Sequence, residues 1–93
     1  MNTFIGVGRI VEIYSNEKVL KFNLSMIQEK PCNIPCLIFS PDDEAKEFVE
    51  NLQTTGEAVW LQGKLISNEF EYNGKSIRNI SIVTYPRSIK LIE

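Results

Sequence analysis

The chain has 93 residues, of which 43% are hydrophobic and 24% are charged, and its formal net charge is −2. This length has room for one hydrophobic core, so we expect a single domain over residues 1–93. The apolar content is that of a globular protein and excludes a disordered one. The charge balance excludes a strongly basic coat for nucleic acid but not a local basic groove, because binding depends on the local field.

Targeting and metal signals are missing from the sequence. No apolar run is long enough to span a membrane, and no basic segment precedes an apolar stretch at the start. We therefore expect a cytoplasmic protein without membrane contact. Cys32 and Cys36 are the only cysteines, and histidine is absent. A zinc site draws on several Cys, His or carboxylate ligands, so we expect reduced thiols, no metal and no cofactor.

Two strands are predicted at the start of the chain. The first covers Thr3–Tyr14 and contains Gly6 and Gly8, which within a strand mark a bend or a close backbone approach. A turn at Ser15–Lys18 leads to the second strand, Val19–Gln28. There, apolar and polar residues alternate with the period of a strand that has one buried and one solvated face.

A third strand and a helix follow a loop at Glu29–Asn33. The strand covers Ile34–Phe39, after which the apolar period becomes helical. Ser40 is suited to cap the helix and Pro41 to fill its first position. The helix is predicted to end by Gln53–Gly56 and to pack on the core through one apolar stripe, made of Ala45, Phe48, Val49 and Leu52.

The second half of the chain predicts a hairpin and a short last strand. Ala58–Tyr72 and Lys75–Tyr85 are joined by Asn73-Gly74, a pair that tolerates the positive φ angles of a two-residue hairpin turn. Pro86-Arg87 ends the hairpin, and Ser88–Ile92 forms the last strand. This order predicts an all-β fold with one inserted helix: a five-stranded Greek-key barrel of the OB type, with the helix between strands three and four. Closing the barrel also removes exposed strand edges.

Four stretches match a known pattern in order and spacing. Phe4–Ile10 reads apolar–Gly–apolar, Val19–Ser25 alternates, and Cys36–Phe39 is an apolar strand that ends in phenylalanine before the helix. Gly56–Leu65 reads glycine–apolar–aromatic–apolar–x–Gly–x–Leu. Together they resemble the bacterial single-stranded-DNA-binding protein family, including its short tailless primosomal relatives. The resemblance covers almost the whole chain and implies an OB-fold protein that binds single-stranded DNA as a dimer or tetramer.

The sequence departs from that family in two places. Asn33, Ile34 and Pro35 stand where the family has a tryptophan and basic residues, so one stacking platform is absent. The sequence also stops at Glu93, without the family's disordered tail and its acidic tip. We therefore expect no recruitment of repair proteins by that route.

Aromatic candidates for base stacking lie at the end of the third strand and beside the hairpin turn. A protein that binds a single strand without reading its sequence stacks flat side chains on unpaired bases. Phe39, Phe70 and Tyr72 are the candidates, and the resemblance places Phe70, seven residues after Gly63, where the family has a base-stacking tryptophan. The alternative is packing: against each other or the barrel rim for the hairpin aromatics, and in the core for Phe39.

Basic residues that could follow the phosphates occupy strand faces and the hairpin. The candidates are Arg9, Lys21, Lys64, Lys75 and Arg78. Alternation points Lys21 and Lys64 outward, while Lys75 and Arg78 interleave with the hairpin aromatics, which is typical of a nucleic-acid groove. The alternative is that these cations only keep exposed strand faces soluble.

Trp60 is predicted to contact a second subunit. It shares its strand face with Gln62 and Lys64, and an exposed tryptophan among polar groups is typical of an interface. We favour this role over a contact with DNA, and we expect a homo-oligomer.

The residues therefore favour single-stranded DNA binding without catalysis, as an accessory to DNA replication, recombination or mobile-element transfer, with replication proteins as further partners. The sequence has no histidine, no Gly-rich phosphate loop and no recognisable nucleophile–base pair, so we expect no enzyme. The alternative is an OB-fold protein–protein adaptor in a replication complex with weak or no nucleic-acid binding. The missing tryptophan and the acidic balance favour that alternative.

Overall fold

The computed structural model describes residues 3–26 and 32–92, except for the side chains of Asn68, Phe70 and Tyr72. Its elements are β1 (Thr3–Ser15), β2 (Val19–Met26), β3 (Cys32–Phe39), α1 (Asp43–Thr55), β4 (Val59–Tyr72), β5 (Lys75–Val83), a 3-10 turn η1 (Pro86–Ser88) and β6 (Ile89–Leu91). Two predicted strand ends were wrong by two residues: β3 begins two residues before Ile34, and β5 ends two residues before Tyr85. The ends of β1, β4 and β6 differ from the prediction by one residue each. Positions 27–31, which carry the predicted end of the second strand and most of the predicted loop, lie outside the described residues.

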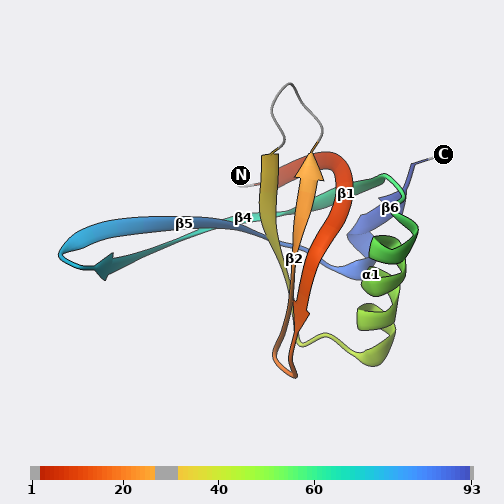
Figure 1. Cartoon of the computed structure of the whole chain (residues 1–93), viewed down its shortest axis with the longest axis horizontal. Coiled ribbons are helices and arrows are strands. Elements are labelled where there is room, and N and C mark those ends of the chain that lie inside the picture. The colour runs from red at the N-terminus through yellow and green to blue at the C-terminus, as the bar shows by residue number, and fades with distance from the viewer. Residues whose placement is uncertain (1–2, 27–31, 93) are drawn as a thin grey trace.

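Five strands close into a ring. Neighbours follow the order β1-β2-β3-β5-β4, and β4 pairs back with β1. The β3–β5 pairing is parallel and the others are antiparallel, while β6 adds to β4 outside the ring. Figure 1 shows α1 on one side of the ring and the β4–β5 hairpin projecting far from the other side. This arrangement confirms the OB barrel with its helix between the third and fourth strands.

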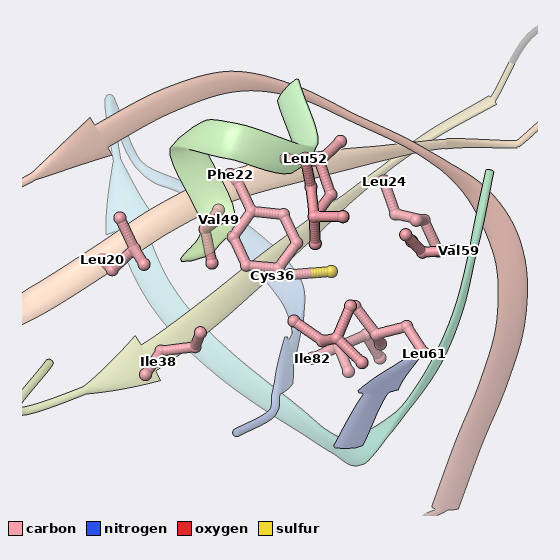
Figure 2. Packing of buried hydrophobic residues seen from close by; sticks show 12 residues of the cluster. Leu20, Phe22, Leu24, Cys36, Ile38, Val49, Leu52, Val59, Leu61 and Ile82 are labelled. Atoms are coloured by element: carbon pink, nitrogen blue, oxygen red, sulfur yellow. The ribbon is translucent and has the colours of Figure 1, made fainter. Parts of the chain in front are cut away.

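The core fills the ring from the inward positions of the strands and from one stripe of α1. Figure 2 shows Val49 and Leu52 of α1 near Phe22, with the sulfur of Cys36 at the centre of the cluster. Burying an aliphatic or aromatic side chain of this kind contributes roughly 1.5–3 kcal/mol. The remaining buried members are Ile10, Leu20, Leu24, Ile38, Val59, Leu61, Ile82 and Ile89.

Glycines permit the closest strand contacts in the barrel. A Cβ atom on Gly8 would lie 2.9 Å from the carbonyl carbon of Ser25, and one on Gly63 would lie 2.6 Å from the carbonyl oxygen of Val83. Both distances are shorter than real Cβ contacts, so a side chain at either position would force the strands apart. The prediction of close backbone approach at Gly8 is therefore confirmed.

A bulge in β1 decides which residues face outward near its end. Val11 pairs with Asn23 and Tyr14 pairs with Lys21, so β1 carries one residue more than β2 over the same interval. Glu12 adopts a φ of 55°, in the left-handed region that non-glycine residues rarely occupy. Because an extra residue reverses the strand's alternation, Tyr14 leaves the core face of Ile10 and is 60% exposed.

The helix begins later than predicted. Asp42 caps it, and its Oδ1 accepts a hydrogen bond from the Ala45 N–H at 2.7 Å. The prediction of Ser40 as the cap was wrong because Ser40 has a φ of 49°, and its N–H donates to the Lys18 carbonyl at 2.9 Å. Ser40 thereby anchors the end of β3 to the β1–β2 turn. Gly56 ends the helix in the left-handed conformation, as a C-terminal glycine commonly does.

Candidate nucleic-acid interface

A row of paired residues crosses the outer face of the barrel, which we call the outer row. Tyr14 pairs with Lys21, Lys21 with Leu37, Leu37 with Val83, and Val83 with Lys64. Cross-strand partners stand on the same face, so these side chains form one continuous row over all five strands of the ring. Neighbouring strands lie about 4.8 Å apart, which places Lys21 and Lys64 about 14 Å apart along the row.

The surface is hollowed at both ends of the outer row. The hollow beside Tyr14, which we call the Tyr14 hollow, has a volume of about 450 Å³, and Lys21, Asn23, Pro35, Asn79 and Ser81 are among its lining residues. The second has a volume of about 340 Å³, and its lining includes Lys64, Val83, Tyr85, Gln62 and Ser88. Each hollow thus places one lysine beside one tyrosine.

Exposed aromatic side chains accompany this face. Phe39 is 53% exposed at the end of β3, which excludes the alternative that it fills the core. Tyr85 is 49% exposed. Phe39 and Tyr85 each follow the parallel Leu37–Val83 pair by two residues, so both extend the face of the outer row. The Arg87 guanidinium carbon lies 5.0 Å from the centroid of the Tyr85 ring, within reach of a cation–π interaction.

Sequence reasoning missed Tyr14, Tyr85 and Arg87. Tyr85 ends the predicted strand Lys75–Tyr85 and follows the outward Val83 by two residues, so alternation along that strand would have found it. Tyr14 gave no such signal, because the bulge at Glu12 reverses the alternation and no glycine marks it.

The predicted cations fall into three groups. Lys21 and Lys64 are exposed on the outer row, as alternation predicts. Arg9 lies apart from them, because its Nε donates a hydrogen bond to the Gly56 carbonyl at 2.8 Å and ties β1 to the end of α1. The third group, Lys75 and Arg78, belongs to the projecting hairpin.

The hairpin separates its two cations. Lys75 and Arg78 are three residues apart in β5, so they lie on opposite faces. Arg78 is paired with Glu69, and its guanidinium lies 3.9 Å from that carboxylate, with both side chains exposed. An exposed ion pair of this kind contributes little to stability. Lys75 pairs with Tyr72, but the Phe70 and Tyr72 side chains lie outside the described part of the structure.

Trp60 lies on a different part of the barrel surface. It is half-buried and pairs with Val7 of β1, which is 48% exposed. Ile5, on the same face of β1, is 57% exposed. The outer face of β1 and β4 therefore presents an apolar strip formed by Ile5, Val7 and Trp60.

A third hollow, of about 530 Å³, follows α1 rather than the outer row. Its lining includes the carboxylates of Asp42, Glu44 and Glu47 around Phe48. Carboxylates repel phosphates, so this hollow suits a nucleic-acid backbone less well than the two hollows at the ends of the outer row. Acidic residues are concentrated on α1, whereas the charged members of the outer row are its two lysines, Lys21 and Lys64.

The two cysteines are free, and Cys36 is chemically quiet. Burial raises the pKa of the Cys36 thiol to about 12, opposed by a backbone hydrogen bond at Leu24. The thiol therefore stays protonated at neutral pH, whereas metal ligation and nucleophilic attack both need the thiolate. Within residues 3–26 and 32–92, no group of His, Cys, Asp or Glu side chains is placed to hold a metal ion. In the same ranges no helix is long and apolar enough to cross a membrane.

The ring of five strands with α1 between β3 and β4 is an OB fold, and comparison with known proteins agrees. No protein-family model matches the chain, and no curated protein sequence matches it either. Among solved structures, the chain is similar to Plasmodium falciparum SSB in complex with ssDNA, with a TM-score of 0.69, 15% identity, and coverage of 100% of this chain and 96% of that one. It is also similar to the mitochondrial single-stranded DNA binding protein Rim1 of S. cerevisiae, with a TM-score of 0.69, 20% identity, and coverage of 98% and 94%. At these identities the likeness establishes a shared fold over nearly the full length of both chains.

Proposed function

We propose that this chain binds single-stranded DNA, without catalysis, along the outer row of its barrel. One observation carries the proposal: Lys21 and Lys64 share a continuous face with the exposed rings of Tyr14, Phe39 and Tyr85. The similar structures include an SSB solved with ssDNA, which supports the same ligand for this barrel.

The chemistry of this face suits an unpaired strand. Stacking of a base on an aromatic side chain contributes roughly 1–3 kcal/mol, and every base has a face that can stack. Lysines add contacts to phosphates that depend on salt but carry no sequence information. A duplex hides the faces of its bases, so this surface favours single strands.

The hairpin extends the proposed contact beyond the barrel. It projects far from the ring in Figure 1, and the β4–β5 connection is one of the loops with which OB folds bind oligonucleotides. We include Phe70, Tyr72, Lys75 and Arg78 as further contacts, with Arg78 on the face opposite to Lys75. Arg9 is a weaker candidate, because Gly56 already holds its guanidinium.

A titration tests the proposed function directly. Fluorescently labelled oligo-dT, added to the purified protein at low salt, should bind at micromolar protein or below, and binding should weaken as salt rises. A duplex of the same length is the control and should bind more weakly. Absence of binding to oligo-dT would contradict the proposal and favour the alternative of a protein–protein adaptor.

We further propose that a second copy of the chain covers the apolar strip of Ile5, Val7 and Trp60. Isolated exposed apolar side chains are ordinary, but these three lie together on two paired strands. A two-fold dimer is the commonest way to cover such a face. A non-catalytic barrel of this kind would act as an accessory to replication, recombination or mobile-element transfer, alongside replication proteins.

A further inference from the structure

The Tyr14 hollow contains one carboxylate, and its position is unusual. Glu12 occupies the bulge of β1 with a φ of 55°, where glycine would be unstrained. Its Oε2 accepts a hydrogen bond from the Asn23 side-chain amide at 2.6 Å, and both residues line the hollow. A non-glycine residue held in the strained left-handed region points to a use for its side chain.

This pair leaves hydrogen-bond acceptors at the hollow. A carboxylate has two oxygens and an amide has one, and the bond between Glu12 and Asn23 occupies only one of the three. In the described part of the chain no donor reaches Glu12 Oε1 or Asn23 Oδ1. A ligand that enters the hollow therefore meets a carboxylate oxygen and an amide oxygen, beside the exposed ring of Tyr14.

A phosphate is the wrong partner for these atoms, because like charges repel, so the backbone of a bound strand fits beside Lys21 instead. A base that stacks on Tyr14 can turn its polar edge toward the two oxygens. Cytosine presents an amino group there, and a carboxylate that accepts from this amino group is an established mode of base recognition. Uracil and thymine carry a carbonyl oxygen in place of the amino group, and their one donor on this edge, N3–H, stands between two carbonyl oxygens that would face the acceptors of the hollow.

We propose that the Tyr14 hollow holds one nucleobase and that Glu12, supported by Asn23, favours cytosine over uracil or thymine. This inference rests on the proposed function and adds a base preference to it. The hollow's volume of about 450 Å³ falls in the range of about 300–1,000 Å³ that is usual for ligand sites. Asn79 and Ser81, on the β5 side of the hollow, add polar groups that could contact the rest of the base edge.

The test compares oligo-dC with oligo-dU, because this pair differs at the amino group and lacks the methyl group of thymine. Labelled strands of about 16 nucleotides, at the upper end of the site size of one OB fold, are titrated by fluorescence anisotropy. We expect the wild-type protein to bind oligo-dC about tenfold more tightly than oligo-dU, the size of one good contact to a base edge. Glu12→Gln keeps an oxygen for the Asn23 amide, loses the carboxylate, and should bring the ratio close to one.

Glu50→Gln, on the exposed face of α1, is the matched control and should keep the tenfold ratio while changing the net charge by the same amount. Equal binding of oligo-dC and oligo-dU by the wild-type protein overturns the inference and leaves the proposed function standing. A preference that Glu12→Gln retains also overturns it, because Glu12 then only supports the bulge. Failure of both strands to bind overturns the inference and the proposed function together.

Discussion

Replacing Lys21 and Lys64 together by alanine removes the two cations of the outer row. Both side chains are exposed, and substitution at exposed positions changes the free energy of unfolding by about 0.5 kcal/mol or less. The double variant should therefore fold normally. Any change in binding then reports on contacts with the nucleic acid rather than on the barrel.

The size of the effect follows from the release of counterions. On a single strand, each neutralised phosphate contributes about −0.7 to the slope of log K against log salt concentration. With one phosphate at Lys21 and one at Lys64, the slope of the double variant should be shallower by about 1.4. If the wild type and the double variant bind equally at about 1 M salt, the affinity of the double variant should be about sixtyfold below that of the wild type at about 50 mM salt. At about 200 mM the difference should be only about tenfold.

Oligo-dT titrations at several salt concentrations measure both quantities. Lys46→Ala on α1 is the matched control, because it removes one positive charge away from the outer row, and its slope should equal that of the wild type. A double variant that binds more weakly with an unchanged slope would refute the reasoning. Its lysines would then contribute something other than phosphate contacts.

Two further predictions concern stability and assembly. Because burial raises the pKa of Cys36 to about 12, its contribution to stability is fully present below about pH 9, where the thiol is protonated in the folded and unfolded states. This contribution is lost as the pH rises toward 12. Between about pH 8 and pH 10, the free energy of unfolding measured in urea should therefore fall about 1 kcal/mol more for the wild type than for Cys36→Ala. Equal falls in the two proteins would contradict this prediction. The native mass of the wild type, measured by sedimentation, should exceed the mass of one chain, and Val7→Lys should reduce it to that of one chain. Ile80→Lys, at an equally exposed position of the hairpin, is the control and should leave the native mass unchanged. A monomeric wild type would exclude Trp60 from any subunit contact.

Strand alternation was sufficient to predict the barrel and part of the proposed binding face. In β2 and β4 the period of two runs without interruption, so Lys21 and Lys64 could be assigned outward and their apolar neighbours inward. It was insufficient in β1, where Glu12 adds a residue and turns Tyr14 outward. A bulge at a non-glycine position has no local signature, because its geometry depends on the partner strand.

The remaining misses arise from contacts between distant parts of the chain. Ser40 and Asp42 are both good helix caps, and the hydrogen bond from the Ser40 N–H to Lys18 left the capping position to Asp42. The outer row itself depends on the parallel pairing of Leu37 with Val83. The helix and the hairpin separate these two segments in the sequence, so no local pattern could place the two lysines on one row.

The pairing of β1 with β4 also bears on how fast the molecule folds. β1–β2, β2–β3 and β4–β5 join strands that are close in sequence, whereas the ring closes between the first strand and one from the second half of the chain. Bringing such distant segments together loses chain entropy before the contacts compensate for it. Barrels dominated by non-local pairing fold in milliseconds to seconds, much more slowly than helical bundles of similar size. Until β4 reaches β1, both strands expose an edge, so the residues that complete the ring are also those through which an unfinished chain would aggregate.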